Sequence, residues 1–163
     1  GDESAFAELF RQFGERTLRY LRGMVGEEAE DLQQEVWLSV FRHLAGLGNP
    51  GAFRTWLYQT TRHRALDFLR RSRRERRLLE EAAPVEDVNE APDPGAVREL
   101  LELRELADRL PPAQREVLLL RYQDDLSYAE IALVVGCPVG TVKSRLHLAH
   151  QRVQQHLSTD QNR

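Results

Sequence analysis

The sequence is poor in the residues that build disulfide-rich, metal-binding or membrane-spanning proteins. Cys137 is its single cysteine, so the chain can form no internal disulfide and no cysteine cluster for zinc. Its longest apolar runs, such as Val117–Leu120 and Ile131–Val135, are far shorter than the roughly 18 residues that span a bilayer. The first residues, Gly1–Ser4, lack the basic start and apolar stretch of a secretory signal. The sequence therefore predicts a cytoplasmic protein without membrane insertion.

Recognisable catalytic motifs are absent as well. The five histidines are scattered, and none forms a His-x-x-x-His pair beside a carboxylate cluster. There is no Gly-rich phosphate loop and no nucleophile elbow. We therefore expect no metal ion, no cofactor and no catalytic residue. An enzyme such as a nuclease or hydrolase is a competing interpretation that no motif supports.

Charge is strongly segregated along the chain, although the net charge of the 163 residues is only -3. Residues 51–79 contain nine arginines and two acidic residues, a balance of +7. Residues 80–108 contain ten acidic residues and two arginines, a balance of -8. A basic block of this kind is typical of a segment that binds nucleic acid. The small net charge of the whole chain does not reveal it, because the acidic block offsets it.

Apolar residues recur at spacings of three and four, the helical period, and no segment shows the alternation of a strand. Residues 80–96 interrupt this pattern with acidic residues, Pro84, Pro92 and Pro94. The sequence therefore predicts an all-α protein with two small helical domains, residues 1–79 and 97–163, joined by an acidic, proline-containing linker. In the first domain, apolar stripes predict three helices, the third beginning near Ala52. The first stripe consists of Phe6, Leu9, Phe10 and Phe13.

The second domain contains a helix-turn-helix pattern. Ser127 and Glu130 have the spacing of a capping box, which predicts that a helix starts at Ser127. Gly136, with Pro138 close behind, should end that helix, and a longer one should follow. The second helix of such a motif lies in the major groove of DNA. The side chains expected to face the DNA are Thr141, Lys143, Ser144, Arg145 and His147.

Other interpretations of these segments remain open at this point. The helix-turn-helix could be an ordinary pair of helices with a solvated face. The arginine block could likewise be a solvated face, although Phe53, Trp56, Tyr58 and Phe68 interrupt it as aromatic platforms for single-stranded nucleic acid would. Asp31, Gln34, Glu35 and Leu38 share one helical surface, which suits a partner helix but also fits a plain exposed face.

Taken together, these segments resemble the extracytoplasmic-function (ECF) sigma factors of bacterial RNA polymerase, of the sigma-70 family. Segments 31–38, 52–58 and 65–71 are similar to the family's second conserved region. Segments 110–122, 126–132 and 136–146 are similar to its fourth region. The resemblance covers nearly the whole chain, and it implies an alternative sigma factor that directs promoter-specific transcription initiation.

The resemblance also implies a role for each surface. Asp31, Gln34, Glu35 and Leu38 would bind core RNA polymerase, and the second domain would read the minus-thirty-five element as duplex. The loop 46–51 and the helix after it would melt the minus-ten element and capture a flipped base. The residues expected at the melted minus-ten strand are Asn49, Arg54, Trp56, Tyr58, Arg62 and His63. An anti-sigma factor is a further expected partner.

Two positions depart from the family pattern. His63 stands where the family usually has asparagine, which affects the expected minus-ten preference. Leu148 stands where a basic residue is common, which removes one expected phosphate contact. A stand-alone helix-turn-helix regulator is the alternative function, but it leaves residues 1–80 without a role.

Overall fold

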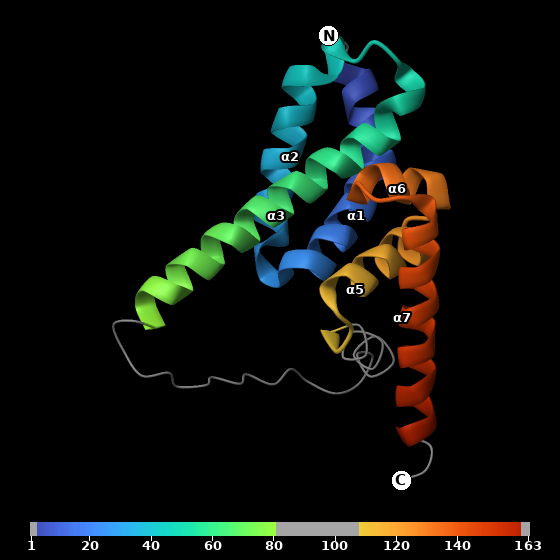
Figure 1. The fold of residues 1–163 in the computed structure, drawn as a ribbon. Helices are drawn as coiled ribbons and strands as arrows, with labels where there is room; N and C mark the ends of the chain where they lie inside the picture. The colour runs from blue at the N-terminus through green and yellow to red at the C-terminus, as the bar shows by residue number, and fades with distance from the viewer. Residues whose placement is uncertain (1–2, 81–107, 161–163) are drawn as a thin grey trace.

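The computed structural model describes residues 3–80 and 108–160, and every regular element in these two ranges is helical, as predicted (Figure 1). The N-terminal half contains α1 (Glu3–Val25), α2 (Ala29–His43) and α3 (Phe53–Glu80). The C-terminal half contains α5 (Pro112–Leu118), the π-helical turn η4 (Leu119–Gln123), α6 (Tyr128–Val135) and α7 (Val139–Asp160). The predicted acidic linker, residues 80–96, lies outside the described residues except at its first position.

The N-terminal bundle forms as its apolar stripes predict. Gly26, with φ +70°, ends α1 in a backbone conformation that side chains with a Cβ rarely adopt, and a 3-10 turn (Gly26–Glu28) leads into α2. The α2 stripe is buried: Leu32, Val36 and Val40 face the bundle. These side chains contact α3, which follows two further 3-10 turns, Leu44–Gly46 and Pro50–Ala52. The predicted start of the third helix near Ala52 is therefore confirmed.

The contribution of α1 to the core differs from the sequence-based expectation. The predicted stripe Phe6, Leu9, Phe10 and Phe13 is only partly buried, and Phe10 is 46% exposed. The residues that α1 buries completely are Thr17, Tyr20 and Leu21, which lie further along the helix. Phe6, Leu9 and Phe13 nevertheless pack against the core that α2 and α3 form, so the predicted stripe faces the bundle, and the fully buried part of α1 begins one turn beyond it.

The long helix α3 has two unlike halves. Its first half buries Phe53, Leu57 and Tyr58 against the bundle. Its second half extends beyond the bundle (Figure 1) and carries most of the arginine block, whose side chains from Arg73 to Arg77 are exposed. Beyond Phe68, which packs against the bundle, the side chains of this half are mostly exposed, so it is held mainly by its own backbone hydrogen bonds.

The helix-turn-helix has the predicted boundaries. The Ser127 hydroxyl accepts a hydrogen bond from the Glu130 N–H, and the Glu130 carboxylate accepts one from the Ser127 N–H, so the capping box is complete. Gly136 ends α6 in the left-handed conformation, with φ +70°. The core between the elements contains Leu120, Leu126, Ile131, Val142 and Leu146.

The two halves pack directly on each other, which the sequence did not predict. Tyr20 of α1 and Tyr58 of α3 are fully buried in the same cluster as Val117, Leu120 and Val134 of the C-terminal half. Helix α6 lies along α3, and η4 lies against α1 (Figure 1). We call this packing of η4 and α6 on α1 and α3 the closed arrangement.

Candidate functional site

The face of α7 that would read DNA is free in the closed arrangement. Lys143, Ser144 and His147 are exposed, whereas Thr141 and Arg145 are partly buried. Val142, Leu146 and Ala149 on the opposite face are buried and fix the rotation of the helix. The Ser144 hydroxyl donates to the Gly140 carbonyl at 3.0 Å, so its oxygen remains an acceptor toward solvent. All five predicted reading residues thus lie near the N-terminal end of α7, the part that contacts bases in this motif.

Two further residues belong to this surface, and sequence reasoning missed them. Tyr128 of α6 lies beside Lys143, and Arg121 of η4 lies beside the same ring. The Arg121 guanidinium carbon is 5.0 Å from the centre of the Tyr128 ring, and the Lys143 ammonium nitrogen is 6.0 Å from it. The sequence did not relate Arg121 to Tyr128, because the two residues lie on different elements that a π-helical turn and a bend separate.

The predicted minus-ten residues divide into a free group and a covered group. Asn49 and His63 are exposed, and the side-chain oxygen Oδ1 of Asn49 accepts a hydrogen bond from the Gly51 N–H at 2.9 Å, which shapes the loop before α3. A hollow of about 380 Å³ lies beside this loop, lined by Leu9, Phe13, Leu44, Leu47, Pro50, Gly51, Phe53 and Arg54. Trp56 is partly buried.

Arg62 belongs to the covered group because it binds the C-terminal half. Its Nε donates to Glu116 Oε1 at 2.5 Å, and the Tyr20 hydroxyl donates to the same oxygen at 2.7 Å. Glu116 is only 5% exposed. Burial raises the pKa of the Tyr20 hydroxyl well above its usual value, and the nearby Glu116 carboxylate raises it further. Glu116 therefore fastens α5 to both α1 and α3.

Arg54 makes a second set of contacts between the two halves. Its Nη2 donates to the carbonyl oxygens of Asp124 and Asp125 at 2.7 and 2.8 Å. Its Nη1 lies 3.8 Å from a Glu130 carboxylate oxygen. Gln59, one turn further along α3, donates to the Leu133 carbonyl at 3.0 Å. The face of α3 predicted to hold the melted strand is thus occupied by backbone and side-chain acceptors of η4 and α6.

Asp124 and Tyr58 are buried at the centre of this contact. Both are fully inaccessible, and neither the Asp124 carboxylate nor the Tyr58 hydroxyl makes a hydrogen bond of good geometry. Burial raises the pKa of Asp124 from 3.8 to about 6, while the Tyr58 hydroxyl, Arg19, Arg16 and Arg54 oppose that rise. Burial also raises the pKa of Tyr58. Tyr58 cannot reach a base while the domains are packed in this way.

The predicted polymerase-facing residues all lie on one side of α2. Asp31, Gln34, Glu35 and Leu38 are exposed, and Leu38 is 55% exposed although it is apolar. A Glu35 carboxylate oxygen lies 3.9 Å from Arg64 Nη1, a contact of two exposed side chains that contributes little to stability.

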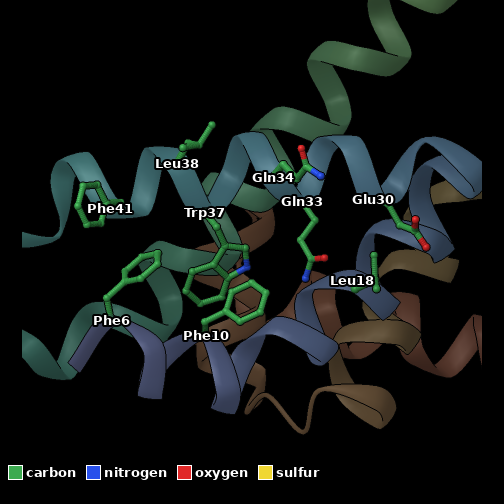
Figure 2. A pocket seen from close by; sticks show the side chains of 9 residues that line it. All are labelled: Phe6, Phe10, Leu18, Glu30, Gln33, Gln34, Trp37, Leu38 and Phe41. Atoms are coloured by element: carbon green, nitrogen blue, oxygen red, sulfur yellow. The ribbon is translucent and has the colours of Figure 1, made fainter. Parts of the chain in front are cut away.

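An apolar groove of about 700 Å³ runs between α1 and α2 on this side (Figure 2). Phe6 and Phe10 of α1 and Trp37 of α2 line its floor, and Leu38 and Phe41 of α2 lie at its edge. Phe41 is 60% exposed, and its ring centre lies 5.3 Å from that of Phe6. The Trp37–Phe41 spacing of four was a signal that sequence reasoning could have used to find this groove.

Two absences concern the described residues alone. In residues 3–80 and 108–160 no group of three or more histidine, cysteine, aspartate or glutamate side chains could hold a metal ion. Within the same ranges no helix is long and apolar enough to cross a membrane.

Comparison with known proteins identifies the two halves. The family model described as "Sigma-70 region 2" matches residues 9–75, and the one described as "Sigma-70, region 4" matches residues 100–153. The two halves therefore define a protein of the sigma-70 class. The ECF RNA polymerase sigma factor RpoE of Cereibacter sphaeroides is 34% identical over 161 residues, which cover 96% of this chain and 88% of that protein. The Bacillus subtilis factor SigW is 29% identical over 172 residues, covering 96% and 91%. The chain belongs to the ECF RNA polymerase sigma factors.

Solved structures agree on the fold. The sigma factor RpoE of Bartonella quintana, in complex with the anti-sigma factor NepR, superimposes with a TM-score of 0.76 at 22% identity, covering 96% of this chain and 98% of that one. CnrH, in complex with the cytosolic domain of CnrY, gives a TM-score of 0.73 at 22% identity, covering 98% and 92%. The prediction of an all-α protein with a helix-turn-helix is confirmed, and so is the prediction of an alternative sigma factor that directs transcription initiation.

Proposed function

We propose that this ECF sigma factor uses three separate surfaces. The exposed side of α2, with Asp31, Gln34, Glu35 and Leu38, binds core RNA polymerase, and the apolar groove beside it receives part of the same partner. The N-terminal end of α7 reads the duplex minus-thirty-five element. The loop around Asn49 and the start of α3 hold the melted minus-ten strand. The factor acts in the cytoplasm and catalyses no reaction itself.

One observation carries this assignment: the N-terminal end of α7 exposes Lys143, Ser144 and His147 while its other face is fixed in a core. A polar reading face on a rigid helix of a helix-turn-helix suits the major groove. On the N-terminal side, an exposed groove lined by five large apolar side chains needs a partner, since a monomer rarely leaves such a patch to water.

The closed arrangement sets an order of events. Arg54, Tyr58 and Arg62 can reach single-stranded DNA only after α5, η4 and α6 leave α3, whereas the reading face of α7 needs no such change. We therefore propose that residues 1–79 and 97–163 separate, joined by the linker 80–96, when the factor engages polymerase and promoter. An anti-sigma factor is the partner that would favour the inactive form. In the similar solved structures, RpoE is bound to the anti-sigma factor NepR and CnrH to the cytosolic domain of CnrY.

Reconstituted transcription tests the proposal. The purified chain is mixed with core polymerase and genomic fragments, and start sites are mapped. A sigma factor needs core polymerase to bind promoters and gives discrete start sites. A stand-alone regulator would bind its operator without polymerase and would produce no transcript with the core enzyme, which would refute the proposal.

A further inference from the structure

We propose that Tyr128 is a positioning residue for promoter reading: its ring gathers Arg121 and Lys143 into one phosphate-binding pair that joins η4 to the recognition helix. The inference rests on the proposed role of α7 and adds Arg121 to its DNA contacts. Neither residue lies on α7, and the helix-turn-helix pattern alone does not select them.

The backbone around Tyr128 is fixed on every side. The capping box of Ser127 and Glu130 holds the first turn of α6, in which Tyr128 is the first residue. Leu126, two residues before Tyr128, is fully buried, and its N–H donates to the Leu120 carbonyl at 3.1 Å. The ring nevertheless remains 38% exposed, so its position is set by the backbone and not by burial in a core.

Two cations meet at this ring. Arg121 is held twice: its Nη1 donates to the Leu126 carbonyl at 3.0 Å, and its guanidinium carbon lies 5.0 Å from the ring centre. The Lys143 ammonium lies 6.0 Å from the same centre, at the outer limit of a cation–π contact. Within the described ranges neither cation forms an ion pair with a carboxylate.

An unneutralised pair of cations at the edge of a recognition helix suits a DNA phosphate. In this motif the first helix crosses the backbone while the second enters the groove. The negative face of an aromatic ring attracts a cation that lies over it, so the Tyr128 ring favours a position beside itself for each of the two side chains. Tyr128 thus holds Arg121 and Lys143 on one aromatic ring, where each can meet a DNA phosphate. Ordering the two long side chains in advance reduces the entropy that binding must otherwise remove.

The test compares Tyr128→Leu with Tyr128→Phe in holoenzyme bound to a duplex promoter that depends on its minus-thirty-five element. Tyr128→Leu removes the aromatic face and keeps the apolar bulk, so affinity should fall about three- to tenfold. The slope of log affinity against log salt should become shallower by about one. Tyr128→Phe keeps the ring and should remain within about twofold of the parent.

Tyr122→Leu is the matched control, because Tyr122 is also an exposed tyrosine of this domain but its ring contacts His150 and neither of the two cations. In a double-mutant cycle, Lys143→Ala should cost less in the Tyr128→Leu background than in the parent. The inference is wrong if Tyr128→Leu behaves like Tyr122→Leu in affinity and salt slope. It is equally wrong if Tyr128→Phe is as weak as Tyr128→Leu, since the hydroxyl would then be the active group. If Lys143→Ala itself leaves promoter binding unchanged, the proposed reading role of α7 fails as well.

Discussion

Replacing Glu116 by glutamine tests how strongly the two domains hold each other. Glu116 is buried and accepts hydrogen bonds from Tyr20 and Arg62, which lie on two different helices of the other domain. The substitution keeps the shape of the side chain and removes its charge. Glu116 belongs to neither the proposed DNA-reading nor the proposed polymerase-binding residues, so a change in domain separation would not reflect a lost contact to either partner.

The magnitude follows from the kind of hydrogen bond that is changed. A hydrogen bond to a charged group contributes about 1.5 to 3 kcal/mol, and one between neutral groups about 0.5 to 1.5 kcal/mol. Glu116→Gln should therefore weaken the closed arrangement by about 1 to 2 kcal/mol. Since 1.4 kcal/mol corresponds to a factor of ten, the ratio of closed to open molecules should fall by about 5- to 30-fold.

Energy transfer between two dyes measures this ratio. Cysteines placed at the exposed positions Arg73 and Gln151, in a Cys137→Ser background, report the distance between α3 and α7. Glu75→Gln is the control, because it removes one exposed carboxylate of α3 without touching the other domain. A second route to the same end is Gly23→Ala, whose added Cβ would lie 2.5 Å from a methyl carbon of Leu119 in the closed arrangement. If Glu116→Gln transfers energy as efficiently as the parent, the contact does not hold the domains together.

Three more predictions concern the other sites. Because burial raises the pKa of Asp124 from 3.8 to about 6, its protonated form favours the closed arrangement; the stabilisation is full below about pH 4 and is lost as pH rises through 6. The closed fraction should therefore fall between about pH 4 and 6.5 in the parent, and Asp124→Asn should remove most of that dependence in the energy-transfer assay. Glu35→Arg should weaken binding to core polymerase about tenfold without changing the melting temperature, because the side chain is exposed; unchanged affinity in a pull-down titration would remove this assignment. Lys143→Ala should impair binding to duplex promoters, whereas His63→Ala should impair opening, so a pre-melted bubble should rescue only the second variant; equal rescue of both would contradict the division between domains.

Local sequence signals predicted where the helices begin and end, but they did not predict how the two domains pack on each other. The capping box at Ser127, the stop at Gly136 and the apolar stripe of α2 each act within one or two turns, so sequence spacing predicts them. The contact of Arg62 with Glu116 spans 54 positions, and that of Tyr20 with Glu116 spans 96. Nothing in the spacing of a buried carboxylate indicates which distant hydroxyl and guanidinium will satisfy it.

The lack of long-range information in sequence spacing also explains which predicted site residues are exposed and which are covered. Exposure on α2 and α7 followed from helical periodicity, and Asp31, Glu35, Lys143 and Ser144 lie on solvent-facing sides as expected. Tyr58 and Arg62 carry the same aromatic and basic pattern as their neighbours, but a second domain covers them. Arg121 and Tyr128 escaped notice because a π-helical turn breaks the period that would have related them.

The chain has a single lysine, and its position at the reading surface has a practical consequence. Lys143 is the only lysine in the chain, and it is exposed. An amine-reactive reagent therefore has a single side-chain target, which lies beside the groove-facing end of α7; the α-amino group at the N-terminus is the only other primary amine. Acylation removes the positive charge of an ammonium, so one mass measurement reports how much of a preparation has lost this cation. Comparing the acylation rate of Lys143 with and without duplex DNA would show whether DNA covers this side chain, and the comparison needs no introduced label.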